Sequence, residues 1–510
     1  MGESTPLLKD QAIKQFRKRR WVTVVIIFFM AFAIGAENAV ILPTAWKYLQ
    51  SLGSTSELDL GILISAFNVA SLISSIFFGW IVDKWMHLCK LVVFVGAIIQ
   101  AIGSIMYFLG FDKWLIISGR FVCGLGSGTL TVILAELARA TSNDERTKYL
   151  TLGFGCRQVG LLLGPAYNLP LHGVNTNFGN IRVNEESMPG LVFAVFWVVA
   201  SVFIFFGYEN IGEQYITLLR TLEAKGDSET VQLLSYPSLE DSEKRAFAEH
   251  GDPTATNNAN DLYSNHVNSS DSNAGARARR PLTETRSIAD DIPLPYVDDE
   301  LDEEETPLVQ KGSSSFRELL LDSIVVVLFM QLILFFCQYV VETIIPPTMQ
   351  TNFGLGTQAN SLFYLLIGCE AILSFAFVIL VRKRISDRIV ILAGNVLLVI
   401  GLIFHLVTAM VLKPHSENAL SFFIASCTLI FLGIPMASVS SVTLGSKLIG
   451  PESQGKMQAL RRVATSLGLI LGPLWAGSLV HEPLPLYGVT LILVFIQLIL
   501  FLLSYSRMHA

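Results

Sequence analysis

Charged residues are scarce in this chain. Of its 510 residues only 15% are charged, whereas a soluble protein carries about 25%. Hydrophobic residues make up 52%, and many lie in apolar runs of about 20 residues, long enough to cross a bilayer. No cleavable signal is visible, because the basic cluster at 14–20 leads into an apolar run that continues to Leu42 without a small-residue cleavage site. We therefore expect a membrane protein with several spans, and we expect its first span to be retained.

Motifs for catalysis and for metal binding are also missing. No G-x-x-x-x-G-K-[ST] loop is present, which argues against ATP-driven pumping. There is no nucleophile elbow, and the six cysteines show neither disulfide nor metal spacing, so we interpret them as small packing residues. We expect no enzyme activity, no cofactor, no bound metal and no nucleic-acid partner.

The apolar runs predict about twelve spans in an all-α membrane fold of two six-helix bundles. The predicted spans are 21–43, 58–81, 91–110, 114–137, 148–169, 189–208, 320–345, 358–380, 388–411, 419–442, 457–480 and 485–505. This divides the chain into a tail (1–20), a first bundle (21–208), a polar segment (209–319), a second bundle (320–505) and a short end (506–510).

Basic residues mark one side of the predicted spans. The loop between spans two and three holds Lys84, His87 and Lys90, and further basic residues join spans eight to nine and ten to eleven. The opposite loops carry few, namely Lys47, Lys113, Arg182 and Lys413. By the positive-inside rule, both termini and the central segment are predicted to be cytosolic, with the lipid bilayer as the main partner.

The polar segments indicate sorting and disorder. Residues 209–319 are rich in Ser, Asn, Asp and Glu, so we expect a disordered acidic loop with a short helix near 209–224. In the N-terminal tail, Glu3, Leu7 and Leu8 fit an acidic dileucine pattern, an address that clathrin adaptors read for endosomes and lysosomes.

A glycine–proline motif occurs once in each half. Gly160, Gly164 and Pro165 lie in the fifth predicted span, and Gly468, Gly472 and Pro473 lie in the eleventh. Glycines four apart share one helix face and allow close approach of a neighbour, while proline removes a backbone donor and bends the helix. We predict that both glycine faces lie at the interface between two bundles that move against each other. The alternative is ordinary helix packing.

Together these features resemble the major facilitator superfamily. Gly79, Asp83 and Lys84 resemble the start of its cytoplasmic motif between spans two and three, although Met86 replaces the usual glycine. The stretch from Arg120 to Gly128 resembles the fourth-span motif, in which an arginine is linked to proton coupling. The glycine–proline motif of span five resembles one that is common in antiporters. The resemblance implies alternating access of a central site.

A closer resemblance is to a lysosomal branch of that superfamily. It rests on the stretches 144–147, 342–346, 368–371 and 446–451, and it implies a late-endosomal and lysosomal membrane protein that conducts chloride. The chain is similar, more distantly, to the facilitator core of vacuolar phosphate transporters, without their regulatory SPX domain.

Ionisable residues at bilayer depth are costly, so they mark candidate sites. These residues are Glu37, Arg120, Arg157, Glu342, Glu370, Arg461 and Arg462. Glu136, near a span end, is expected to reach water.

Each candidate has two interpretations. Arg120 either couples protons or ties helices together. Arg157 either attracts an anion or neutralises Glu37 or Glu342. Arg461 and Arg462 either line the cytosolic mouth or bind lipid phosphates.

The carboxylates also allow two interpretations. Glu342 precedes Pro346 and Pro347, where we predict that the helix breaks near the non-cytosolic mouth. Glu342 or Glu370 is either a proton site and gate of the anion path or a structural carboxylate paired with an arginine.

The preferred hypothesis is movement of a small anion, chloride first, across the endolysosomal membrane. A second is proton-coupled transport of an organic solute or phosphate. A third is a membrane scaffold that recruits partners through the acidic loop.

Overall fold

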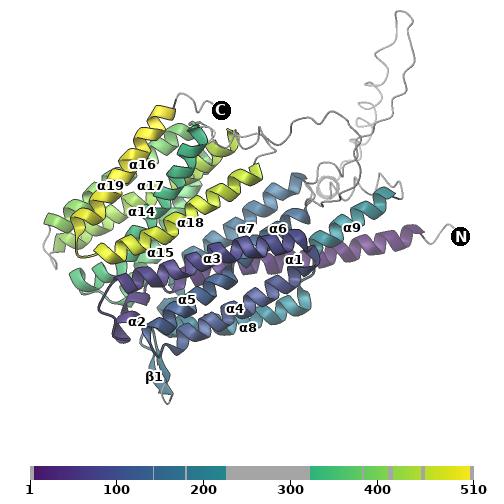
Figure 1. The fold of residues 1–510 in the computed structure, drawn as a ribbon, viewed down its shortest axis with the longest axis horizontal. Helices are drawn as coiled ribbons and strands as arrows, with labels where there is room; N and C mark the ends of the chain where they lie inside the picture. The colour runs from purple at the N-terminus through teal and green to yellow at the C-terminus, as the bar shows by residue number, and fades with distance from the viewer. Residues whose placement is uncertain are drawn as a thin grey trace, which may run out of the picture.

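The computed structural model describes residues 5–141, 143–178, 181–224, 322–381, 384–411, 417–448 and 454–505. Ten helices in these ranges are long and apolar enough to cross a membrane, and the less apolar α7 and α18 complete the predicted arrangement of about twelve. In Figure 1 the helices of the first half (purple to teal) lie beside those of the second half (green to yellow). The prediction of an all-α fold of two six-helix bundles is confirmed.

The first bundle and its attachments are built from α1 (Thr5–Val40), α2 (Ala45–Ser51), α3 (Leu58–Lys84), η1 (Met86–Leu88), α4 (Cys89–Leu109), α5 (Lys113–Ser127), α6 (Thr129–Arg139), α7 (Asn143–Leu163), η2 (Pro165–Leu171), β1 (Asn175–Phe178), β2 (Ile181–Asn184), α8 (Met188–Gly207) and α9 (Ile211–Ala224). The second is built from α14 (Asp322–Phe353), α15 (Thr357–Val381), α16 (Asp387–Val411), α17 (Glu417–Lys447), α18 (Gln454–Leu479) and α19 (Pro483–Ser504).

The two ends of the bundles differ. The antiparallel β1–β2 hairpin pairs Asn175 with Asn184, and it lies with α2 at the end opposite α9 and the start of α1 (Figure 1). We call the end with α2 and the hairpin the hairpin face, and the other end the terminal face.

Two segments near the terminal face extend beyond the predicted spans. Helix α1 begins at Thr5, well before the predicted start at 21, because the basic stretch that precedes the span has good helix formers. Helix α9 matches the short helix expected near 209–224. The prediction that Glu136 reaches water is wrong. Glu136 is buried beneath the first turn of α9, where its carboxylate accepts the Gly212 N–H at 2.8 Å. A carboxylate at a helix N-terminus satisfies donors that the helix leaves free.

Several sequence predictions fall outside the described residues. These include Glu3 of the dileucine pattern, the acidic segment at 225–321 and the chain end at 506–510. Leu7 and Leu8 belong to α1, but the description does not extend to their side chains.

The glycine motifs pack inside each bundle, so the prediction that they lie between the bundles is wrong. A Cβ on Gly160 would lie 2.0 Å from the Phe32 carbonyl oxygen of α1. In the second half, a Cβ on Gly468 would lie 2.5 Å from the Leu332 carbonyl oxygen of α14. Gly164 and Gly472 repeat these contacts one turn later, against Ala36 and Phe336. Each motif therefore fixes its helix to the first helix of its own bundle, and the opposite faces of α7 and α18 meet the other bundle.

The two prolines of these motifs have different effects on their helices. Proline at 473 removes the N–H that would bond the Leu469 carbonyl, and the Asn68 amide of α3 donates to that oxygen instead, at 3.3 Å. Ser65 donates to the next carbonyl, Ile470, at 2.7 Å. Helix α18 continues to Leu479, whereas α7 ends at Leu163 and Pro165 begins a 3₁₀ segment. These side chains of α3 also join the two bundles.

Replacing Asn68 with leucine should therefore loosen α18. The substitution leaves the Leu469 carbonyl without a donor, at a cost of about 1–3 kcal/mol. We expect faster amide hydrogen exchange in 465–479 and a lower thermal midpoint in detergent. Thr490→Val is the control, because that buried hydroxyl donates only within its own helix, to the Leu486 carbonyl. Equal exchange in the two variants would contradict this role of Asn68.

The prediction that the helix breaks at Pro346 and Pro347 is also wrong. Helix α14 runs through both prolines to Phe353. Proline at 346 removes the donor to the Glu342 carbonyl, and the Tyr364 hydroxyl of α15 donates to that oxygen at 2.5 Å. A side chain from a neighbouring helix thus satisfies the backbone group that the proline frees.

Candidate functional site

Arg120 and Glu37 form a buried unit inside the first bundle. Arg120 donates to the Glu37 backbone carbonyl at 3.4 Å, and its guanidinium lies 4.4 Å from the centre of the Phe67 ring. The Glu37 carboxylate accepts the Ser104 hydroxyl at 2.8 Å. Both charged residues are only 2% exposed. This arrangement joins α1, α3, α4 and α5, which favours the helix-tying interpretation of Arg120.

Arg157 lies on α7, one turn before the glycine motif, and keeps partial exposure. Its guanidinium donates to the neutral Gln158 side chain at 3.2 Å, and its Nε is buried without a hydrogen-bond partner. Within the described ranges it forms no ion pair, with Glu37, Glu342 or any other carboxylate. Its guanidinium is within electrostatic range of the Tyr339 side chain of α14 in the other bundle. Arg157 thus presents an uncompensated cation to the bundle interface.

Two further arginines on α18 face the same region. Arg462 crosses between the bundles to donate to the Ser75 hydroxyl of α3 at 2.8 Å, and Arg461 donates to Gln458 at 2.9 Å. Both are half-buried, and the charge of Arg462 is within electrostatic range of Arg157 and Arg461. All three guanidiniums have neutral hydrogen-bond partners in the described part of the chain. Such a group of like charges favours an anion between them.

The two carboxylates of the second bundle also have neutral partners. Glu342 is buried on α14 and accepts the Gln338 amide at 2.7 Å. Glu370 is half-buried on α15 and accepts the Thr428 hydroxyl at 2.8 Å, while its second oxygen has no partner. Among the described residues neither is paired with an arginine, so the structural pairing considered above is not seen. Asn38 of α1 donates to the Tyr339 hydroxyl at 3.4 Å, close to Arg157 and Glu342.

A junction centred on Glu185 closes the hairpin face. This loop residue accepts the Lys47 ammonium of α2 at 2.6 Å and the Thr357 hydroxyl of α15 at 2.7 Å. His172 lies 3.0 Å from its other oxygen, and Glu186 also pairs with Lys47 at 2.7 Å. One carboxylate therefore links the first bundle to the second.

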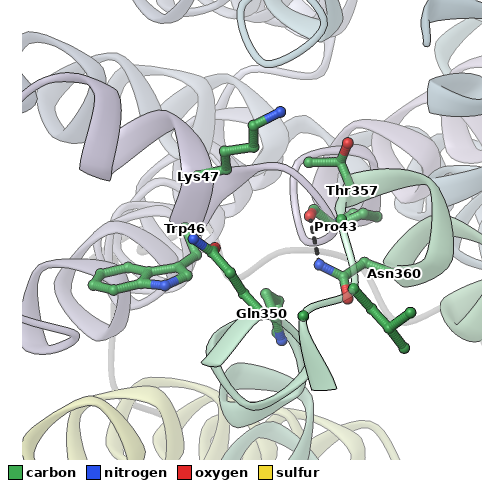
Figure 2. Close-up of a pocket in the computed structure, with 10 residues that line it drawn as sticks. Pro43, Trp46, Lys47, Gln350, Thr357 and Asn360 are labelled. Carbon is green, nitrogen blue, oxygen red and sulfur yellow. Dashed lines mark hydrogen bonds between the residues drawn. The ribbon is translucent and has the colours of Figure 1, made fainter. Parts of the chain in front are cut away.

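Other contacts close the same face beside this junction. Gln350 donates to Gln50 at 2.7 Å, Asn360 donates to the Pro43 carbonyl at 3.2 Å, and His481 lies 3.1 Å from Glu57. Figure 2 shows a small pocket of about 180 Å³ between Trp46 and Lys47 of the first half and Gln350 and Asn360 of the second. Among the described hydrogen bonds between the bundles, the one from Arg462 to Ser75 lies nearest to the terminal face. The described conformation is closed at the hairpin face.

This closure should withstand acid. Burial alone would raise the pKa of Glu185, but the hydrogen bonds from Lys47 and Thr357 and the charge of Lys47 lower it to about 2. An unfolded glutamate titrates near pH 4.3, so the stabilisation by the carboxylate is complete above about that pH and is lost as the pH falls toward 2. We expect the spin-label distance between positions 51 and 351 to be unchanged from pH 7.5 to 4. A transition near pH 4–5 that Glu185→Ala abolishes would contradict this.

The motif of Gly79, Asp83 and Lys84 makes contacts at the terminal face within the first bundle. Asp83 pairs with Arg139 at the end of α6, and the Lys84 ammonium lies 4.9 Å from the centre of the Trp85 ring. Gly79 makes no close backbone contact, since its Cβ would meet only the Thr131 side chain at 4.0 Å. The ion pair thus connects α3 to α6 within one bundle.

Sequence reasoning missed the Glu185 junction. Glu185, Glu186 and His172 lie in a polar loop and resemble ordinary solvated residues, and Thr357 lies in the other half of the chain. The only available signal was Lys47, one of few cations in the loops on that side.

The sequence is similar to those of known membrane proteins. A similar chain is major facilitator superfamily domain-containing protein 8 of Xenopus laevis, 26% identical over 218 residues, which is 40% of this chain and 43% of that protein. An SPX domain-containing membrane protein of Arabidopsis thaliana is 28% identical over 202 residues, 38% of this chain and 27% of that protein. The chain therefore matches less than half of the length of these relatives.

Solved structures show the same fold over nearly the whole chain. A bacterial homologue of the human lysosomal transporter Spinster, in an inward-facing and unoccupied conformation, has a TM-score of 0.64 at 13% identity and covers 96% of this chain and 97% of its own. The nucleoside transporter NupG has a TM-score of 0.58 at 11% identity, with 94% and 99% coverage. A family model described as Major Facilitator Superfamily matches residues 27–208 and 327–509. The chain is thus a member of the major facilitator superfamily.

Proposed function

We propose that this transporter moves a small anion, chloride first, along the interface between its two bundles. The observation that supports this is the group of Arg157, Arg461 and Arg462, whose hydrogen-bond partners in the described ranges are all neutral. A cationic substrate would be repelled there, whereas an anion would gain from all three charges. Closure at the hairpin face and its release would expose the group to each side in turn.

The orientation and location are part of the proposal. The terminal face carries Lys84, Lys90, Arg388 and Lys447, so we assign it to the cytosol. Two observations support the late-endosomal and lysosomal membrane: the dileucine pattern with Glu3, Leu7 and Leu8, and the resemblance of the sequence to a lysosomal branch of the superfamily. Clathrin adaptors would be the partners that read the pattern.

Proton-coupled transport of an organic solute or phosphate is the second candidate. Glu342 favours it, because a buried carboxylate whose hydrogen-bond partner is neutral is a natural place for a proton. Glu370, with one oxygen unpartnered, would serve similarly.

Chloride current in patch-clamped enlarged endolysosomes tests the proposal. We expect the wild-type chain to add a chloride current and Arg157→Ala to reduce it about tenfold, the effect of removing a charged hydrogen-bonding partner. Lys148→Ala is the matched control, since it removes an exposed cation from the same helix. Absence of a wild-type current, or equal currents in both variants, would refute the anion proposal. A transporter that instead moves a solute with protons would acidify or alkalinise the lumen when that solute is supplied.

A further inference from the structure

An apolar groove lies on the outer side of the first bundle, between α1 and α8. Its volume is about 540 Å³. It is lined by Trp21, Val22, Val25, Ile26, Val202, Phe203, Phe206 and Gly207. All of these except Gly207 are apolar side chains, and most are strongly exposed, with Phe206 at 80% and Trp21 at 71%. The groove therefore opens toward the lipid and remains unfilled by the protein itself.

Gly207 keeps the groove open. A Cβ at this position would lie 3.1 Å from Ile26 Cδ1 and 3.6 Å from Val22 Cγ1. Those two atoms belong to α1 on the facing wall, so any larger side chain at 207 would occupy the space between the helices. The groove thus depends on the absence of one side chain.

Two exposed cations stand at the end of the groove near the terminal face. Arg17 and Lys18 are exposed on α1 and lie four residues before Trp21 and Val22, which places them on the same helix face one turn away. Neither forms an ion pair within the described part of the chain. The adjacent Arg19 differs, because it pairs with Glu209 at 3.1 Å. The rim of the groove therefore carries net positive charge.

We propose that the groove binds an anionic phospholipid, with one acyl chain between α1 and α8 and its phosphate at Arg17 and Lys18. Both features are needed to identify the occupant. The apolar lining matches an acyl chain, and the cations match a negatively charged headgroup. Trp21 lies where the two regions meet, and tryptophan favours the boundary between headgroups and hydrocarbon. A zwitterionic lipid would fill the groove but would gain little from the rim.

Native mass spectrometry of the purified, delipidated full chain tests this site. Phosphatidylglycerol and phosphatidylcholine with identical acyl chains are added in turn. We expect the wild type to retain phosphatidylglycerol about fivefold better, the gain from roughly one favourable cation contact at the surface. Arg17→Gln with Lys18→Gln should abolish the preference but keep acyl-chain binding, and Lys148→Gln should leave the preference intact.

Gly207→Leu should remove binding of both lipids, because its side chain would fill the groove. Val202→Phe should have the same effect, and it enlarges a side chain that lines the groove and is already exposed. Gly488→Leu is the matched control, because no atom lies within 4 Å of a Cβ at that position. A wild type without a lipid preference, or groove variants that bind like the control, would overturn the proposal.

Discussion

Replacing Gly160 with alanine is expected to destabilise the fold more than the same substitution at Gly155 or Gly468. The new Cβ would lie 2.0 Å from the Phe32 carbonyl oxygen. That atom is backbone, so it cannot rotate away, and α1 must separate from α7. A Cβ on Gly35 would meet the Arg157 carbonyl oxygen at 2.1 Å, so the two helices interlock through both glycines. Overpacking typically costs about 1–3 kcal/mol, and we expect this rigid contact to lie at or beyond the upper end.

Gly155→Ala on the same helix provides the comparison. No atom lies within 4 Å of a Cβ there, and alanine favours the helix by about 0.8–1.0 kcal/mol relative to glycine. Thermal unfolding in detergent can be measured as the fraction of protein that remains monodisperse after heating. The midpoint should fall strongly in Gly160→Ala and should not fall in Gly155→Ala. Gly468→Ala, whose Cβ would lie 2.5 Å from the Leu332 oxygen, should fall between them. Similar midpoints for all three variants would contradict the tight α1–α7 contact.

Removal of the Glu185 carboxylate is expected to release the hairpin face. Glu185→Ala eliminates the bond to Thr357 in the second bundle and one of the two partners of Lys47, while Glu186 remains. Because Lys47 is nearly half exposed, we assign the loss a modest cost of about 1–2 kcal/mol. Such a cost shifts the balance between closed and open states by a factor of about 5–30.

Spin labels at Ser51 and Thr351, on either side of the bundle interface, report this shift. In nanodiscs the wild type should give a short distance, and Glu185→Ala should add a longer population. Glu482→Ala removes an exposed carboxylate from the same face and should leave the distance unchanged. If Glu185→Ala behaves like Glu482→Ala, the junction does not hold the gate closed.

The sequence allowed the spans to be predicted because hydrophobicity is a local property. Its failures concern which neighbour a residue meets. The spacing of Gly160 and Gly164 shows that one helix face is packed closely, yet it is silent on whether α1 or the other bundle lies there. The prediction of a break at Pro346 failed because the compensating hydroxyl, Tyr364, belongs to a different helix.

The candidate site was partly predictable for the same reason. Arg157 was found from its depth in the fifth predicted span, and Arg461 and Arg462 from their position near the start of the eleventh. The apolar pattern of each span reveals such residues by itself. Their lack of ion pairs, and the contrasting burial of Arg120 against Glu37, depend on packing between helices. Glu185 escaped notice because its contact with the second bundle is made through Thr357, which is 172 residues away.

Chloride flux into liposomes that contain the purified chain tests the central claim most directly. The arginine group predicts a measurable flux in the wild type, partial retention in Arg157→Lys, which keeps the charge, and about a tenfold loss in Arg157→Ala. Lys148→Ala should match the wild type. If removing the Arg157 charge leaves the flux unaltered, anions do not pass between the bundles along these three guanidiniums.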